Sequence, residues 1–579
     1  MSLARRLRGV SGDIELERPL REPLAVGQRR TFQVIRLPGP GLGRKVPPGL
    51  ETIDATLRLV TEHGYIYVQD GQPVEDGDIV AAGEALEEVL PTVLRFGALP
   101  QPGVDGDSHV AVVYAELPNL GGYVNDADFY PMAVAPASNE AEGVYIDIGL
   151  LRSRAVNPSV LAHELQHLVH FGVDPNEEVW VQEGLSQVAG VLVSEVSTGF
   201  LQFAAAPDTQ LNVWDPTGES FANYGGAELF FRYLLHRTGD DPAILEELVA
   251  EPADGIEGVE AVLRRHVPGV TFEDFFADFV TANLANAEKG PYGYDDITVS
   301  PRLAATLTGP VEDAGSVHQF AADYIEVELP QGNAVFSFEG ESTVSALGNE
   351  AHSGRGQWWS GRGDAIDSTL TRTLDLRGLT SATLTFWTWF DIENWYDYGF
   401  VEVSTDSGRT WQALPGLHTT DEDPLHQAYG PGYTGISGGA EAPDWVEEHI
   451  DLTPFAGRVV LLRFEYVTDG GVSTRGWALD DIAVPELNLL DDAEASGDWQ
   501  AEGFQRIEEP LRQRFVLRLI EFGPDLRVTD IPLDDQNRAQ VRLTGFGAGL
   551  ERAVIVVAAA TRGTSEVAPY RYSLLRPAP

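Results

Sequence analysis

His163-Glu164-Leu165-Gln166-His167 is the stretch of this sequence that decides how the chain around it must fold. Residues four apart lie on one face of an α-helix, about 6 Å apart along its axis, so both imidazoles can bind a single zinc ion. The glutamate between them can then act as a general base on a water molecule beside the metal. The five residues therefore predict a helix that carries a zinc site.

The residues around the motif predict where this helix begins and ends. Asn157 suits the position that caps a helix, Pro158 suits the first helical position, and Gly172 suits the end. Between these signals an apolar face recurs at helical spacing, formed by Val160, Leu161, Leu165, Leu168 and Val169. The alternative, two core histidines beside a solvated glutamate, does not explain why the motif and the helix signals coincide.

Composition narrows the classes of protein to which the chain can belong. The 579 residues include 39 basic and 89 acidic side chains, and the formal net charge of −50 disfavours binding to nucleic acid or to anionic membranes. There is no cysteine, so disulfides, thiolate metal sites and cysteine nucleophiles are excluded. No stretch approaches the roughly 18–20 apolar residues of a membrane span.

The N-terminal region contains no recognisable targeting segment. Arg5, Arg6 and Arg8 are not followed by the apolar run of a signal peptide. Either the chain is cytoplasmic or its signal peptide has been removed, and the acidic composition suits a secreted or cell-surface protein. We expect such a protein, and we expect it to be a monomer.

The chain is too long for one hydrophobic core, and its composition changes along its length. The start is polar and then rich in proline and glycine, which suggests a leader or the remnant of a pro-region. A Gly/Pro/Thr-rich passage at 290–315 and an acidic break at 490–494 mark later boundaries. We therefore predict four regions: a leader at 1–49, a catalytic domain at 50–310, a β-sandwich module at 311–487 and a C-terminal β domain at 488–579.

Hydrophobic periodicity predicts the order of elements inside these regions. Short strand-like runs precede the motif and helices follow it, which is an α+β arrangement. The expected strands are 31–37, 56–60, 65–68, 110–114 and 144–148, with one helix at 82–90. The later helices are expected at 176–196, 221–237, 242–251, 256–266 and 271–286. After residue 310, alternating runs such as 382–390 and 460–466 predict β-sandwiches.

Two histidines leave a zinc ion short of a protein ligand, so the sequence must supply a third. A carboxylate from the next helix would complete the site and leave one position open for water. Glu183 is the preferred candidate, and Glu177 and Glu178 remain open as alternatives. Asp174-Pro175 is expected to cap this second helix, and Trp180 and Leu185 are expected to anchor it against the first.

His170 is not expected to complete the zinc site. It lies about 10 Å along the helix from His163, too far to share a metal ion, and we expect it at the surface or behind the ligands. A metzincin is also excluded, because His170 and Val173 occupy the positions at which that class requires glycine and histidine.

The sequence around the motif resembles the gluzincin peptidases of the hyicolysin and immune inhibitor A-like groups. Leu161-Ala-His-Glu-Leu-Gln-His-Leu-Val169 is followed by Trp180-Val-Gln-Glu-Gly-Leu-Ser186, the order found in those groups. The resemblance implies a zincin-like (thermolysin-like) α+β catalytic domain in which Glu183 is the third ligand. It also implies a residue that stabilises the oxyanion. Tyr224 is the expected residue, unless its ring only packs at the start of a helix.

A second resemblance covers the β-rich part of the chain. Trp358-Trp-Ser-Gly-Arg-Gly-Asp364, the segment 403–411 and Gly476-Trp-Ala-Leu-Asp-Asp-Ile482 are similar to the sandwich (jelly-roll) module of immune inhibitor A proteases. Such modules can bind Ca²⁺, so structural calcium ligands are expected among Glu393, Asp397, Asp480 and Asp481. The zinc motif continues differently from that of immune inhibitor A itself, so the catalytic half resembles the hyicolysin group more closely.

These features predict a multidomain zinc endopeptidase that acts on proteins or peptides. Its expected zinc ligands are His163, His167 and Glu183. Glu164 would take a proton from the attacking water, and Tyr224 would hold the oxyanion. The alternative is a non-catalytic extracellular adhesion or glycan-binding protein with a vestigial zinc site, whose binding face would use exposed tryptophans such as Trp395. The intact Glu164 favours the enzyme.

Overall fold

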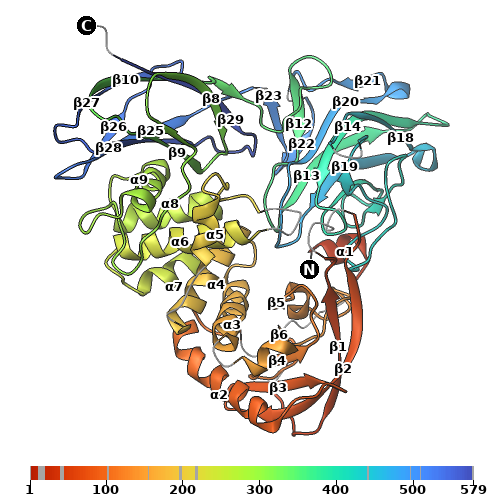
Figure 1. Cartoon of the computed structure of the whole chain (residues 1–579). Coiled ribbons are helices and arrows are strands. Elements are labelled where there is room, and N and C mark those ends of the chain that lie inside the picture. The colour runs from red at the N-terminus through yellow and green to blue at the C-terminus, as the bar shows by residue number, and fades with distance from the viewer. Residues whose placement is uncertain are drawn as a thin grey trace.

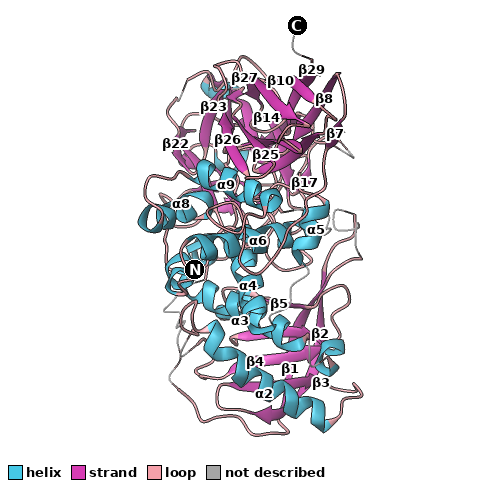
Figure 2. Ribbon diagram, turned by 60° about the vertical axis from the view of Figure 1, so that its left-hand side comes forward, coloured by secondary structure: helices cyan, strands magenta, loops and turns pink. Residues whose placement is uncertain are grey.

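The structure is a computed structural model of the chain. It describes residues 2–576 with the exception of 11–17, 19, 40–44, 101–102, 154–155, 195–198, 215–219, 440–441, 496 and 509. The chain forms several bodies and contains both helices and many β-strands, with a β-rich C-terminal part (Figure 1). A mixed sheet lies at one end, helices fill the middle, and the β-sandwiches lie at the other end (Figure 2).

The mixed sheet has six strands in the order β1-β2-β3-β4-β6-β5. Their bounds are β1 Arg29–Arg36, β2 Gly49–Val60, β3 Gly64–Gln69, β4 Val110–Ala115, β5 Gly122–Val124 and β6 Gly143–Asp147. β3, β4 and β6 run parallel, whereas β1, β2 and β5 are antiparallel to their neighbours. β5 therefore forms an antiparallel edge of the sheet. The expected strand at 31–37 is β1, so the region expected as a leader contributes the opposite edge.

Helices cover one face of this sheet and continue beyond it. Their bounds are α2 Asp76–Val93, α3 Asn157–Val173, α4 Val179–Ser194, α5 Gly199–Ala205, α6 Phe221–Arg237, α7 Ala243–Val249, α8 Gly255–His266 and α9 Phe272–Ala285. α2 and α3 share a buried core with the sheet, and Trp180 and Leu185 of α4 are fully buried in the same core, as expected. Among the described residues, no helix is long and apolar enough to cross a membrane.

The start of α3 differs from the expected capping arrangement. The helix begins at Asn157 itself, and its side chain does not cap the helix. Instead Asn157 is buried and accepts a hydrogen bond from Tyr114 Oη of β4 at 3.0 Å. The prediction of Asn157 as the cap was therefore wrong by one position. Its side chain is engaged in the hydrogen bond with Tyr114 and does not bind the backbone N–H groups at the start of the helix. Pro158 lies in the first turn, as expected.

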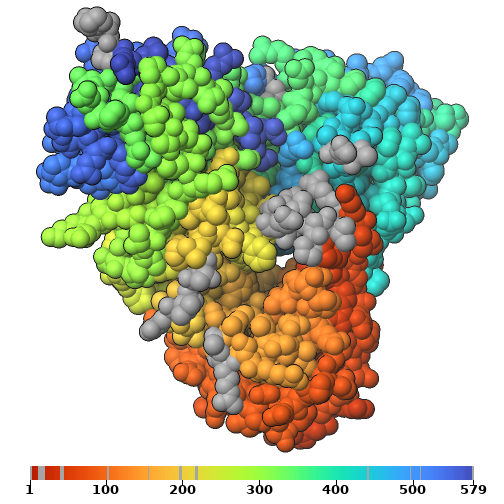
Figure 3. All heavy atoms as spheres, viewed as in Figure 1, coloured from red at the N-terminus to blue at the C-terminus, as the bar shows by residue number. Residues whose placement is uncertain are grey.

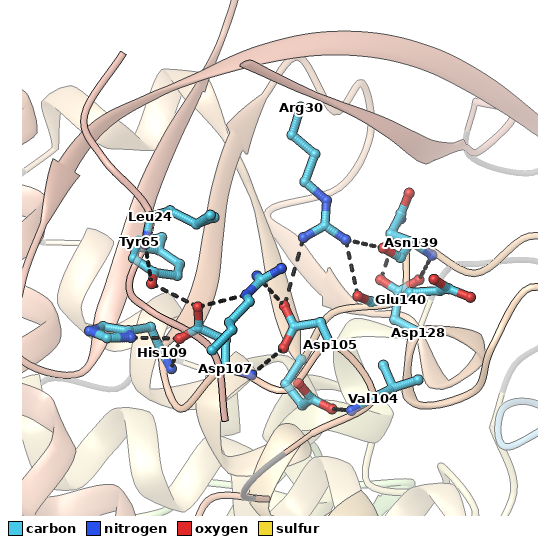
Figure 4. A network of polar contacts seen from close by, with 12 residues as sticks. Leu24, Arg30, Tyr65, Val104, Asp105, Asp107, His109, Asp128, Asn139 and Glu140 are labelled. Atoms are coloured by element: carbon cyan, nitrogen blue, oxygen red, sulfur yellow. Dashed lines mark hydrogen bonds and ion pairs between the residues drawn. The ribbon is translucent and has the colours of Figure 1, made fainter. Parts of the chain in front are cut away.

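A polar network fixes the N-terminal segment against the sheet (Figure 4). Arg21 binds Asp105 at 2.9 Å and Asp107 at 3.1 Å. Tyr65 Oη donates to Asp107 at 2.8 Å and accepts from the backbone N–H of Leu24 at 2.9 Å. One arginine of the N-terminal segment thus pairs with both aspartates.

The middle β-sandwich consists of two sheets that face a shared core rich in aromatic residues. One sheet contains β12 Gly356–Trp359, β14 Thr383–Ile392, β17 Gly435–Ile436, β18 Val446–Asp451, β20 Gly476–Val484, β21 Leu489–Asp491 and β23 Gln505–Glu508. The other contains β13 Asp367–Asp375, β15 Tyr398–Ser404, β16 Gln412–Ala413, β19 Val459–Val467 and β22 Gln500–Glu502. The short N-terminal helix α1 (Ser2–Leu7) binds this sandwich, since Arg6 forms an ion pair of 2.6 Å with Glu465.

The C-terminal β-sandwich combines strands from two distant parts of the chain. One sheet contains β8 Val311–Val317, β10 Gly332–Gly340, β27 Arg538–Phe546 and β29 Ala568–Leu575. Facing it lie β25 Phe515–Phe522, β26 Arg527–Ile531 and β28 Arg552–Ala559, together with the pair β7 Ala305–Leu307 and β9 Ala321–Val327. The pair β11 Thr343–Val344 and β24 Leu511–Arg512 joins the two sandwiches.

These pairings do not follow the division expected at 310/311 and 487/488. β10 pairs with β27 and β29, so residues after 310 share a sheet with the last part of the chain. β21, β22 and β23 lie after residue 487 but pair with strands of the middle sandwich. The middle sandwich is thus inserted into the C-terminal sandwich. Strand alternation alone does not reveal this, because it does not say which strands are partners.

Candidate metal centre

The side chains of His163, His167 and Glu183 converge where α3 and α4 pack together. The Nε2 atoms of the two histidines lie 3.1 Å apart. Glu183 Oε2 lies 3.2 Å from Nε2 of His163 and 3.4 Å from Nε2 of His167. Ligand atoms on a tetrahedral metal with bonds of about 2.0–2.1 Å are about 3.3 Å apart. Two imidazole nitrogens and one carboxylate oxygen at this spacing fit a zinc ion.

The packing of α4 explains why Glu183 faces the histidines. Ser186 Oγ of α4 donates a hydrogen bond to Gln166 of α3, which fixes the register of the two helices beside His167. Gly184 permits a close approach to α6 on the other side, because a Cβ at this position would lie 2.4 Å from the ring of Phe231. With Gly184 facing α6, the preceding Glu183 points toward α3.

One carboxylate oxygen of Glu183 is free to bind a cation. Its Oε2 atom is buried, and no donor in the described part of the chain forms a hydrogen bond of suitable geometry with it. Burial alone would raise the pKa of this carboxyl, but the charges of His167 and His163 outweigh burial and lower the pKa. Glu183 is therefore ionised, as a metal ligand must be.

Glu177 and Glu178 point away from the histidines. Glu177 Oε1 accepts the backbone N–H groups of Glu178 at 2.6 Å and of Gly255 at 2.7 Å. Glu178 Oε2 accepts the indole N–H of Trp180 at 2.7 Å. Both carboxylates thus serve the packing around the first turn of α4, and only Glu183 joins the histidine pair.

Glu164 lies beside the histidines and against the edge strand β5. A Cβ on Gly122 would lie 2.7 Å from Glu164 Oε1, so the strand approaches the carboxylate closely. Glu164 is only 4 % exposed. Burial raises the pKa of its carboxyl, and the charges of His163 and His167 oppose that rise without cancelling it.

Tyr224 approaches the same cluster from α6. Its hydroxyl donates to Glu183 Oε1 at 3.3 Å, and its ring centroid lies 6.4 Å from that of His163. The ring of Trp214 packs edge-on against it at 5.0 Å. The tyrosine therefore does more than pack at a helix start, since its hydroxyl reaches a side chain of the cluster.

His170 is buried rather than exposed on the surface. Neither of its ring nitrogens has a hydrogen-bond partner among the described residues. Burial and the charge of His167 lower the pKa of His170 to about 3, so it is neutral. The surface position was wrong: His170 lies one helical turn beyond His167, on the same side of α3 as the histidine pair, and it is buried there.

The surface is hollowed between the helical part and the mixed sheet. Figure 3 shows this recess between the yellow helices and the orange segment to which β5 and β6 belong. His163 and His167 each retain a side-chain exposure of 15 %. Molecules can therefore reach the cluster from solvent.

Comparison with known proteins gives matches to one family model and to several bacterial proteins. Residues 340–508 match the family described as "Immune inhibitor A-like, MAM domain". The pre-pro-metalloprotease PrtV of Vibrio cholerae is 33% identical over 156 residues, which are 26% of this chain and 16% of PrtV. Immune inhibitor A of Bacillus thuringiensis subsp. alesti is 31% identical over 157 residues, 26% of this chain and 21% of that protein. The chain is related to the immune inhibitor A-like metallopeptidases.

A further relative matches more of the chain. The neutral metalloprotease ShpI of Staphylococcus hyicus is 22% identical over 301 residues, 46% of this chain and 68% of ShpI. By contrast, the chain spans less than a quarter of the length of PrtV and of immune inhibitor A. The MAM-domain match ends at 508, just where the structure ends the middle sandwich with β23.

The residues expected as calcium ligands fall into two separate groups within the MAM-like sandwich. Glu393 and Asp397 offer oxygen atoms that lie, with one of Asp469, within 4.8 Å of one another. Asp480 and Asp481 lie elsewhere, where Asp481 binds His352 Nδ1 at 2.7 Å and Asp480 accepts the backbone N–H of Ser353 at 2.9 Å. Sequence reasoning missed Asp469, because nothing in its local pattern marks it as a neighbour of Asp397.

The tryptophan named for a glycan-binding face is not exposed. Trp395 is buried, and its indole N–H donates to Glu422 at 3.1 Å. The prediction of an exposed Trp395 was therefore wrong, because its hydrogen bond lets the whole ring turn into the protein.

Proposed function

We propose that the chain is a zinc-dependent endopeptidase with His163, His167 and Glu183 as the zinc ligands. The observation that carries the proposal is the convergence of these three ligand atoms beside the carboxylate of Glu164. A zinc ion held there supplies a Lewis acid that polarises the scissile carbonyl and makes a water molecule more acidic. The metalloprotease names of two relatives support the same reaction class.

The mixed sheet and the helices that follow it are the proposed catalytic domain, of zincin-like (thermolysin-like) fold. Within the described residues, edge strand β5 pairs with β6 alone, so its other side can pair with an extended peptide. A peptide bound along β5 passes the carboxylate of Glu164, since Gly122 of that strand approaches Glu164 closely. Protein and peptide substrates fit this arrangement.

Glu164 is the proposed general base. Its carboxylate accepts the proton of the attacking water and later donates this proton to the leaving amine. Burial raises the pKa of the group, which favours a residue that must first accept and then release a proton. Tyr224 is proposed to donate its hydroxyl proton to the developing oxyanion in a hydrogen bond, because that hydroxyl already lies beside the ligand cluster.

The alternative function is binding without catalysis, as an extracellular adhesion or glycan-binding protein with a vestigial zinc site. The complete set of ligands and base weighs against it, because burying Glu164 and Glu183 costs stability that a scaffold could avoid. The burial of Trp395 removes the tryptophan suggested for such a binding face. We propose a secreted or cell-surface location and a monomeric enzyme.

Zinc analysis combined with a casein assay tests this proposal. The purified chain is expected to hold about one zinc ion and to lose casein hydrolysis in 1,10-phenanthroline, with recovery when zinc is added back. The same assay without phenanthroline serves as the control. A metal-free chain with full activity, or a zinc-loaded chain without activity on any protein, would contradict the enzyme.

We also propose one structural calcium ion in the MAM-like sandwich, at Glu393, Asp397 and Asp469. Asp397 is only 1 % exposed, and its Oδ2 atom has no hydrogen-bond partner in the described part of the chain. Its other oxygen accepts the backbone N–H of Asp469 at 2.9 Å. A buried carboxylate with a free oxygen among two other carboxylates suits a hard cation with oxygen ligands.

Calcium is therefore expected to raise the unfolding temperature of the full chain. At 100 times its Kd, a ligand specific for the folded state stabilises it by about 2.7 kcal/mol. Asp397→Asn is expected to abolish the shift measured by differential scanning calorimetry, whereas Asp481→Asn, in the other acidic group, should retain it. If calcium leaves the wild-type transition unmoved, no calcium site exists there.

A further inference from the structure

A loop of the MAM-like sandwich reaches the helix that carries Glu183. The loop connects β12 to β13 and includes Arg362 and Asp364. Asp364 Oδ2 accepts the backbone N–H of Val179, the first residue of α4, at 2.7 Å. The two residues lie 185 positions apart in the sequence, and Asp364 is 4 % exposed. The start of this helix is thus capped by a different domain.

The residues just before α4 do not cap this helix, and Asp364 of the sandwich does so instead. The first N–H groups of a helix lack partners within it, and the positive end of the helix dipole favours a carboxylate. Asp174-Pro175, expected to cap this helix, lies too early, because α4 starts at Val179. The nearby Glu177 binds the backbone N–H groups of Glu178 and Gly255 instead.

The same loop also contacts the segment that supports Tyr224. Arg362 Nη2 donates to the backbone carbonyl of Asn212 at 3.3 Å. Two residues later, the ring of Trp214 packs against Tyr224. One loop therefore touches the supports of both Glu183 and Tyr224.

We propose that Asp364 and Arg362 are positioning residues of the metal centre. Through them, the MAM-like sandwich helps to hold the zinc ligands of the active site in place. Glu183 lies about one helical turn beyond Val179, so a shift in the first turn of α4 displaces its carboxylate from the histidines. This inference rests on the proposed zinc function. It assigns to the sandwich a role in zinc binding in addition to any contact with substrate.

Packing between two domains does not explain why an aspartate, and not an apolar residue, occupies position 364. Its carboxyl is buried, and Oδ1 has no hydrogen-bond partner among the described residues. An apolar side chain of similar size would fill the interface without burying a polar group. The hydrogen bond to the first turn of α4 is what an apolar side chain cannot provide.

Zinc affinity of the full chain tests the proposal independently of activity. Asp364→Ala removes the acceptor for Val179, and we expect zinc affinity to fall by about 10-fold in competition with a chromophoric chelator. Asp364→Asn keeps an oxygen that can accept the same N–H, so its affinity should stay close to that of the wild type. Asp375→Ala, an exposed carboxylate of β13 bonded to Arg377, is the matched control.

The visible spectrum of the Co²⁺-substituted chain gives a second readout, because it reports ligand geometry. We expect the spectrum to change in Asp364→Ala and to be restored in Asp364→Asn. Wild-type affinity and spectrum in Asp364→Ala would overturn the inference while leaving the zinc site intact. If the alanine variant does not fold, Arg362→Gln is measured in its place, and unchanged zinc affinity in that variant would overturn it. A wild-type chain that binds no zinc would instead overturn the proposed function.

Discussion

Replacing Glu164 with glutamine is expected to lower peptide hydrolysis by a factor of about 10²–10⁴. Glutamine keeps the size of the side chain and its place against Gly122, but its amide cannot accept a proton from water. Zinc affinity should remain close to that of the wild type, because Glu164 is not among the three converging ligand atoms. Rate measurements on a fluorogenic peptide, with parallel zinc titration, give both quantities.

A second substitution separates a base from a merely structural carboxylate. Glu164→Asp keeps the acid but shortens its reach, so we expect a rate between those of the wild type and Glu164→Gln. If Glu164→Gln retains most of the wild-type rate with zinc bound, another group takes the proton and the mechanism is wrong. If it loses zinc as well as rate, Glu164 acts on the ligands and not on the water.

The helical half of the fold could be predicted because its signals are local. The motif, the apolar face and Pro158 all fall within one helix, and α3, Asn157–Val173, begins one residue earlier than expected. The later helices were also expected close to their observed positions, for example α6 at Phe221–Arg237. In each case residues a few positions apart decide the structure, and a single sequence contains them.

The errors arise where a distant residue decides the local structure. Asn157 does not cap α3, because Tyr114 of β4 binds its side chain. Asp174 does not cap α4, because Asp364 of the sandwich supplies the acceptor. Strand β10 was expected in the middle module, but its hydrogen-bond partners β27 and β29 lie near the end of the chain. No local pattern contains such information.

The candidate site could be predicted from the sequence only in part. The spacing of His163 and His167 is a local property of a helix, so the pair could be predicted with its geometry. The third ligand could not be derived from spacing alone, since Glu177, Glu178 and Glu183 all lie near the start of the next helix. The resemblance to gluzincins favoured Glu183, and the structure adds a physical reason, since hydrogen bonds to other groups engage both competitors.

The choice between these carboxylates leads to the second large expected effect. Glu183→Gln is expected to weaken zinc binding by more than about 100-fold, the upper end of what a residue that only supports a ligand contributes. The carboxamide is a much poorer zinc ligand than the carboxylate, and it leaves the two histidines as the only strong protein ligands. Competition with a chromophoric chelator at constant pH measures the loss.

Glu178→Gln is the matched control, because it makes the same chemical change at a half-buried carboxylate five positions earlier. Its oxygen can still accept the indole N–H of Trp180, so the first turn of α4 keeps this support. Zinc affinity should therefore stay close to that of the wild type. The reverse result, with zinc lost in Glu178→Gln and retained in Glu183→Gln, would remove Glu183 from the ligand set. The proposed metal centre would then have to be rebuilt around a different third residue.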